Sequence, residues 1–186
     1  MSAVTATASP ESLSKQQLAK RWAQILQDPV LRNLPYRIEV NKWGHIEMMP
    51  PPSPMHMRVA TTLAILLREQ LGGTAFTESA IATASGVRIA DVVWCSDAYM
   101  TRHSAAFKSW EPSLVEAPEL CIEVMSPSNL YAELREKVML YLAAGAREAW
   151  IVSSDLTIDV YDATGRRSTS ALQLDLAVLV AALRAL

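Results

Sequence analysis

The segment PELCIEVMSPSN, residues 118–129, contains an apolar run with one carboxylate inside it. As a strand, it would carry only apolar residues on one face and Glu123 between Cys121 and Met125 on the other. Nearly every position is apolar, which indicates a central strand covered on both faces. A carboxylate such as Glu123 is unfavourable there unless it meets a cation, a metal ion or a second acid. Open α/β sheets usually place their ligands near the end of such a strand.

The remaining pattern predicts a mixed sheet flanked by helices, of the α/β or α+β class. Helices are expected over residues 9–27, 54–71 and 130–144, and the apolar segment 172–186 has a helical period in its second half. Further strands are expected over residues 36–40, 45–49, 75–83, 87–95, 149–152 and 157–161, with a polar loop over 96–117. We expect one domain over residues 1–186, with 1–8 disordered and 9–35 forming an N-terminal helical extension.

Two helices have apolar stripes that can be assigned residue by residue. The first is expected to begin with Ser9 as its cap and Pro10 in its first turn. Its buried face would consist of Leu18, Trp22, Ile25 and Leu26. The stripe of the second would consist of Met55, Val59, Leu63, Leu66, Leu67 and Leu71.

Composition narrows the possible functions. The formal net charge of −2 argues against a strongly basic protein that binds nucleic acid non-specifically. The two cysteines, Cys95 and Cys121, lie in apolar runs without metal-ligand spacing, so we expect buried free thiols. No apolar stretch is long enough for a membrane span, and the N-terminus lacks the features of a signal peptide. We therefore expect a cytoplasmic protein that does not bind membranes.

Three ionisable residues lie in apolar surroundings: Asp91 in IADVVW, Glu123 in LCIEVM, and Lys137 on the next helix. If the two strands are neighbours, the two carboxylates converge and repel each other unless a cation or a shared proton lies between them. Hard oxygen ligands suit Mg²⁺ or Mn²⁺, and a nearby ammonium would complete a site for phosphoryl chemistry. The alternative is structural: Glu123 is a buried ion-pair partner, and Lys137 is a solvated lysine paired with Glu133.

The segments ADVVW, PELCIEVMSPSN and EKVMLYLAAGAREAWIV together resemble the Uma-type family of restriction-endonuclease-like proteins, in the PD-(D/E)XK nuclease superfamily. The hairpin RIEVNKWGHIEMMPPPSPMH is similar to the early hairpin of that family, and the resemblance covers residues 36–161. It implies a restriction-endonuclease-like core and Mg²⁺-dependent (or Mn²⁺-dependent) hydrolysis of phosphodiester bonds.

The resemblance also implies roles for individual residues. Asp91 and Glu123 would be metal-binding acids, with a backbone carbonyl near Val124 as a possible third ligand, and Lys137 would be the catalytic lysine. The superfamily usually carries its lysine two residues after the second acid, where this chain has Met125. Lys137 would then replace it from the helix.

Two auxiliary residues complete the set that the resemblance implies. Glu39 stands in the hairpin where the family carries a glutamate, and a structural role is the alternative. His56 would orient a carboxylate or contact phosphate, and the alternative is a partly exposed histidine in the first helical turn. Arg88 is a candidate for phosphate contacts.

Three functions remain open. The favoured one is an endonuclease acting on DNA as a homodimer, since enzymes that cut both strands often pair two sites. The second is a catalytically inactive module of the same fold that binds nucleic acid or serves in assembly, which predicts a Glu123–Lys137 ion pair without metal affinity. The third is a phosphohydrolase acting on a small substrate. The apolar segment 172–186 either closes the core or forms a dimer interface.

Overall fold

The computed structural model describes residues 11–31, 34, 36–127 and 129–186, so the disorder expected for residues 1–8 concerns a segment outside the described residues. The helices are α1 (Lys15–Gln27), α2 (Pro54–Leu71), α3 (Asp97–Arg102), α4 (Ser104–Lys108), α5 (Tyr131–Ala143) and α6 (Leu176–Arg184). The strands are β1 (Arg37–Asn41), β2 (Ile46–Met49), β3 (Thr74–Thr83), β4 (Gly86–Cys95), β5 (Leu120–Val124), β6 (Glu148–Val152), β7 (Ile158–Asp162) and β8 (Gly165–Arg167).

The strands form one mixed sheet in the order β2-β1-β4-β5-β6-β7-β8, with β3 paired to β4 off this path. β5 and β6 are parallel, and α5 connects them. The other strand pairs are antiparallel. β4 and β5 are neighbours, as the convergence of Asp91 and Glu123 requires. The expected mixed α/β class is confirmed.

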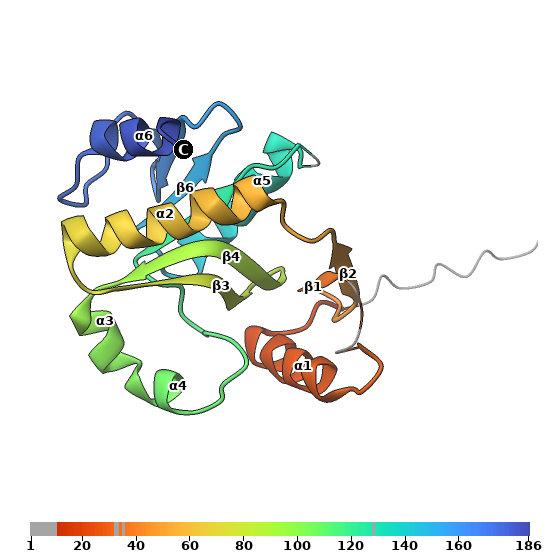
Figure 1. Cartoon of the computed structure of the whole chain (residues 1–186). Helices are drawn as coiled ribbons and strands as arrows, with labels where there is room; N and C mark the ends of the chain where they lie inside the picture. The colour runs from red at the N-terminus through yellow and green to blue at the C-terminus, as the bar shows by residue number, and fades with distance from the viewer. Residues whose placement is uncertain (1–10, 32–33, 35, 128) are drawn as a thin grey trace, which may run out of the picture.

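Helices cover both faces of the sheet, which explains why the central strands are apolar on both sides (Figure 1). α2 and α6 pack on one face, where Leu63 and Leu179 meet Ile122 and Trp150 of the sheet. α5 packs on the other face through Leu134, Val138 and Tyr141. α1 lies beside the β1–β2 hairpin and forms a smaller cluster with it.

One edge of β4 has two different neighbours, and this arrangement creates the site. β3 pairs with β4 at every position except Glu78 opposite Asp91, and so occupies the other edge of β4. On the edge of β4 away from β3, β1 pairs with β4 only at Gly86 and Val87, whereas β5 pairs with residues 92–94 of β4. Between these two stretches, no strand of the described residues pairs with this edge. Gly86 permits the close approach of β1, because a Cβ there would lie 1.8 Å from the Val40 carbonyl oxygen.

Several local expectations were wrong. Ser9 and Pro10, the expected start of the first helix, lie outside the described residues. α1 itself begins at Lys15, where the Ser14 side chain accepts a hydrogen bond from the Gln17 amide in a capping box. Leu26 and Met55 are exposed rather than buried. The expected loop over residues 96–117 contains α3 and α4.

The C-terminal segment closes the core. Leu172, Leu179 and Leu183 are buried among residues of α2 and the sheet, which favours this alternative over an exposed interface. Cys95 and Cys121 are buried free thiols, as expected. Within the described residues, no helix combines the length and apolarity that crossing a bilayer demands.

Candidate active site

A cavity of about 560 Å³ opens at the gap between β1 and β5. It is walled by the β1–β2 hairpin, residues 50–53, the turn after β5 and α5. Its carboxylate-bearing residues are Glu39, Glu47, Asp91, Glu123, Glu133 and Glu136. Its permanently cationic residues are Arg37, Arg88 and Lys137. Six acids against three cations make this cavity acidic, so it can accommodate an additional cation.

Glu123 lies at the floor of the cavity with only 2% of its surface exposed. Its Oε2 atom is 2.8 Å from Nζ of Lys137, and its Oε1 atom accepts a hydrogen bond of 2.6 Å from the Tyr141 hydroxyl. Lys137 and Tyr141 are one turn apart on α5, so the helix presents both donors to the same carboxylate. The rotamer of Glu123 is thereby determined by contacts on both oxygens.

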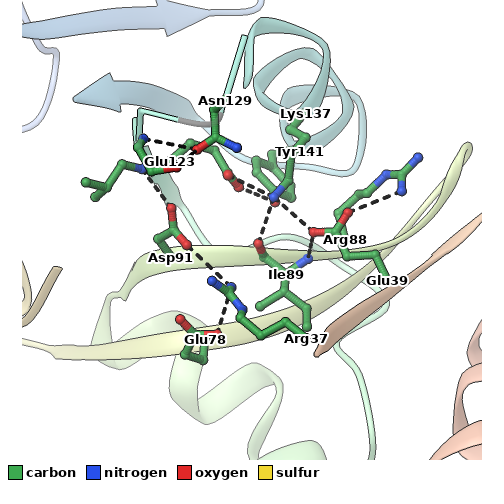
Figure 2. A network of polar contacts seen from close by, with 12 residues as sticks. Arg37, Glu39, Glu78, Arg88, Ile89, Asp91, Glu123, Asn129, Lys137 and Tyr141 are labelled. Atoms are coloured by element: carbon green, nitrogen blue, oxygen red, sulfur yellow. Dashed lines mark hydrogen bonds and ion pairs between the residues drawn. The ribbon is translucent and has the colours of Figure 1, made fainter. Parts of the chain in front are cut away.

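Lys137 fills the gap along β4, as Figure 2 shows. Besides Glu123 of β5, its ammonium contacts Oε1 of Glu39 on β1 at 3.0 Å and donates to the Ile89 carbonyl of β4 at 3.0 Å. The Ile89 amide in turn donates to Oε1 of Glu39 at 3.0 Å. A lysine and a glutamate therefore satisfy the backbone groups that a neighbouring strand would otherwise pair.

Asp91 is held by different partners, all from outside α5. Its Oδ2 atom lies 3.1 Å from Nε2 of His56 and accepts a hydrogen bond of 2.8 Å from the Val124 amide. Its Oδ1 atom has a longer contact of 3.5 Å with Nη2 of Arg37. His56 is buried rather than partly exposed, because α2 directs its first turn toward β4.

The surroundings shift the pKa values of the two acids in opposite directions. Burial raises the pKa of Glu123 to about 8, because the Lys137 ammonium only partly offsets the loss of water and the repulsion from Asp91 and Glu39. Burial also opposes ionisation of Asp91, but the hydrogen bond and charge of His56 lower the pKa of Asp91 below its ordinary value. The same hydrogen bond raises the pKa of His56. Asp91 is therefore the acid that stays ionised at neutral pH, and Glu123 binds a proton more readily.

Lys137 keeps its charge in this setting. Burial alone would lower the pKa of Lys137, but the carboxylates of Glu123, Glu39 and Asp91 raise it above its ordinary value. Burial together with the nearby Glu123 charge raises the pKa of Tyr141, so its hydroxyl remains a hydrogen-bond donor.

The backbone is irregular beside Asp91. Glu78 has a φ of 56°, which costs a residue other than glycine about 1 kcal/mol or more. The β3–β4 register passes from Thr77↔Val92 to Ser79↔Ala90, so Glu78 and Asp91 face each other without pairing. The alternation of faces also breaks here, since Ala90 packs on the α5 face and Val92 on the α2 face. This irregularity turns Asp91 into the cavity.

The structure brings together the side chains of five of the residues singled out from the sequence: Glu39, His56, Asp91, Glu123 and Lys137. The alternative of a solvated Lys137 paired with Glu133 is wrong, because Glu133 accepts a hydrogen bond from the Leu130 amide and Lys137 turns inward.

Arg88, a candidate for phosphate contacts, instead pairs with Glu39 at 3.2 Å and Glu47 at 2.5 Å. Sequence reasoning missed Arg37 and Glu78, which lie 2.7 Å apart at the edge of the site. Their sequence context is that of ordinary polar residues in strands, so no pattern identifies them.

The donor atoms of this cavity fit a magnesium or manganese ion. Among the described residues, no group of three or more His, Cys, Asp and Glu side chains is arranged to hold a metal. Mg²⁺ does not require such a group, because it usually keeps several waters and takes one or two protein carboxylates. Asp91 and Glu123 line the same acidic cavity and offer hard oxygen atoms.

Comparison with known proteins identifies the family and the fold of this chain. A family model described as "Uma2: Putative restriction endonuclease" matches residues 22–183. The chain is also similar to a crystal structure described as "a putative nuclease belonging to DUF820" from Anabaena variabilis, with a TM-score of 0.67 and 15% identity. That match covers 87% of this chain and 98% of the other, and it shows a shared fold. A search of the curated proteins finds no match.

Proposed function

This chain belongs to the Uma2 family, and from that premise we propose that it is a metal-dependent endonuclease that hydrolyses phosphodiester bonds of DNA. The observation that carries the proposal is the meeting of Asp91, Glu123 and Lys137 in one acidic cavity. This combination of two acids and an ammonium is what phosphoryl chemistry with a hard cation requires.

We assign Asp91 and Glu123 to hold Mg²⁺ or Mn²⁺, with the Val124 carbonyl as a further candidate ligand. When bound, the ion would lower the pKa of an attacking water and neutralise charge on the phosphate oxygens. The side chains of this protein would stabilise the charge on the phosphate and position the two acids.

Lys137 keeps a positive charge beside Glu123, where negative charge would develop on a phosphodiester during hydrolysis. Glu39 positions that ammonium, and Tyr141 holds the second oxygen of Glu123. His56 orients Asp91 and favours its ionised form. Met125, at the usual position of the lysine, packs among apolar residues of the α5 face, so the charge comes from the helix.

The first test is calorimetric titration of Mn²⁺ and Mg²⁺ into the wild type, Asp91→Ala and Glu123→Ala. Glu136→Ala is a matched control, because Glu136 lines the same cavity but is exposed. We expect saturable binding that both test variants lose and the control retains. Cleavage of plasmid DNA by the wild type and the same variants would then test hydrolysis. Absence of metal binding to the wild type would refute the metal-dependent mechanism.

One observation favours a second candidate, a catalytically inactive module of the same fold that binds nucleic acid or serves in assembly. Both oxygens of Glu123 already have partners on α5, the Lys137 ammonium and the Tyr141 hydroxyl. A purely structural site would show the same contacts. The inactive module predicts that the wild type binds no metal in the titration and that Glu123→Ala is strongly destabilised.

We further propose that the endonuclease acts as a homodimer. Cleavage of both strands of a duplex calls for two sites, and a symmetric dimer is the commonest way to supply them.

A further inference from the structure

The three cations of the cavity differ in how many of their hydrogen-bond donors are already used. A lysine ammonium has three N–H donors. Those of Lys137 are matched by three acceptors: Glu39 at 3.0 Å, Glu123 at 2.8 Å and the Ile89 carbonyl at 3.0 Å. Lys137 can therefore supply charge to a substrate, but it has no donor left with which to hold one.

The guanidinium of Arg88 also has acceptors for its hydrogen-bond donors. Its Nη1 atom contacts both Glu39 and Glu47, and its Nη2 atom donates to the Ser85 carbonyl. Its side chain is only 12% exposed. Two carboxylates already neutralise this guanidinium, so Arg88 is a poor site for a further anion.

Arg37 differs from Lys137 and Arg88 in its exposure and in the number of hydrogen-bond donors that it has left unused. It lines the same cavity, and its side chain is 23% exposed. Within the part of the chain that the structure describes, its ion pairs and hydrogen bonds involve only Nη2, which lies 2.7 Å from Glu78 and 3.5 Å from Asp91. The Nε and Nη1 donors are left over, and guanidinium is suited to gripping phosphate with two parallel hydrogen bonds.

The partner of Arg37 is one that a substrate can displace. The Glu78 side chain is 47% exposed, and exposed ion pairs are weak and easily exchanged. Figure 2 shows the Arg37 guanidinium between Glu78 and Asp91, so an anion that replaced Glu78 would remain beside the acid assigned to the metal. Glu78 has its unusual backbone conformation at the position of β3 that faces Asp91 without pairing.

We propose that Arg37 binds the phosphodiester group of the substrate and that Glu78 occupies the guanidinium as an anionic placeholder until the substrate displaces it. This assignment rests on the proposed nuclease function and adds to it the residue that grips the phosphate. It predicts that the two members of one ion pair have opposite effects on binding: removal of Arg37 weakens it, and neutralisation of Glu78 strengthens it.

The test measures binding of a short fluorescein-labelled DNA duplex with phosphorothioate linkages, which resist hydrolysis, by fluorescence anisotropy in Mg²⁺. Arg37→Ala should weaken binding about tenfold or more, the loss expected for a charge-assisted hydrogen bond. Arg37→Lys should recover only part of the lost affinity, because an ammonium cannot donate the two parallel hydrogen bonds of a guanidinium. Glu78→Gln should tighten binding about two- to fivefold, the equivalent of one exposed ion pair.

Arg58→Ala is the matched control, because Arg58 is an exposed arginine on α2 outside the cavity lining, and it should change binding less than twofold. Thermal melting of every variant checks that it folds. The inference is overturned if Arg37→Ala binds like the wild type, if Glu78→Gln weakens binding, or if the folded wild type does not bind the probe.

Mn²⁺ titration of the same proteins separates this inference from the proposed function. Mn²⁺ binding without a dependence of DNA binding on Arg37 would overturn the placeholder and leave the metal site intact. DNA binding that depends on Arg37, without Mn²⁺ binding, would support the placeholder and refute the metal mechanism.

Discussion

Replacement of Lys137 by methionine is the most informative single perturbation of the site. Methionine keeps most of the length of the side chain on α5 and removes only its charge and its three donors. The Glu123 carboxylate then loses its cation, whereas the Tyr141 hydroxyl still reaches it. Glu39 is less affected, because Arg88 still pairs with it at 3.2 Å.

The expected loss can be worked out from these contacts. Breaking a buried ion pair by removing one partner costs about 3–5 kcal/mol, because the other charge is left uncompensated. Glu123 can escape this penalty by taking up a proton. Its pKa is already raised to about 8 with the ammonium present, and removal of the ammonium raises it further.

The raised pKa of Glu123 determines how the stability penalty of Lys137→Met depends on pH. A carboxyl group whose folded-state pKa is raised contributes stability that is present below its unfolded pKa, about 4.3, and is lost as the pH rises through the folded value. Below about pH 8 Glu123 is protonated in the folded wild type and in the folded variant alike, so the penalty of Lys137→Met should be small and nearly constant there. The penalty should grow above about pH 8, where Glu123 ionises only in the wild type.

The assay is urea unfolding of the wild type and the variant at about pH 5, 7 and 9.5, with the free energy of unfolding extrapolated to water. Arg135→Met on the same helix is a suitable control, because Arg135 is exposed and forms no ion pair among the described residues. A penalty below about 1 kcal/mol at every pH, or one that shrinks as the pH rises, would refute the reasoning.

Two further predictions concern the same carboxylate. Tyr141→Phe removes the 2.6 Å hydrogen bond to Glu123 and should lower the free energy of unfolding by about 1.5–3 kcal/mol, measured by urea unfolding; no loss would show that the bond contributes nothing to stability. Mn²⁺ affinity should rise by up to about tenfold per pH unit below pH 8, because Glu123 with its pKa of about 8 must release a proton to bind the ion. Calorimetry in two buffers of different ionisation enthalpy would detect that proton, and a pH-independent affinity would contradict the prediction.

Much of the site could be predicted from short stretches of sequence. Asp91 and Glu123 stand out because each is an acid in an apolar strand, and such a charge requires a partner. Lys137 stands out because it is a cation on the helix that follows. These are local signals of buried charge, and the structure places Lys137 at Glu123 and both acids in one cavity.

Arg37 and Glu78 could not be found in this way. Their roles depend on the pairing of β1 with β4 and on the positive φ of Glu78, and neither feature leaves a periodic signal in the sequence. The errors in α1 and α2 have a related cause. Leu26 and Met55 fit an apolar helical stripe, but whether an end residue of a stripe is covered depends on the neighbouring elements.

The gap along β4 also has a consequence for how the protein opens locally. β1 is joined to β4 by only two residue pairs, so its backbone ladder alone would let the hairpin separate readily from the sheet. Lys137, bonded at once to β1, β4 and β5, joins the hairpin to the central strands through side-chain atoms. Separating the hairpin would leave buried charges without partners, so the hairpin and the central sheet should exchange their amide hydrogens as one cooperative unit. Lys137, the residue assigned to catalysis, therefore also holds the hairpin on the sheet. A substitution of Lys137 that abolishes activity should also lower the stability of the hairpin.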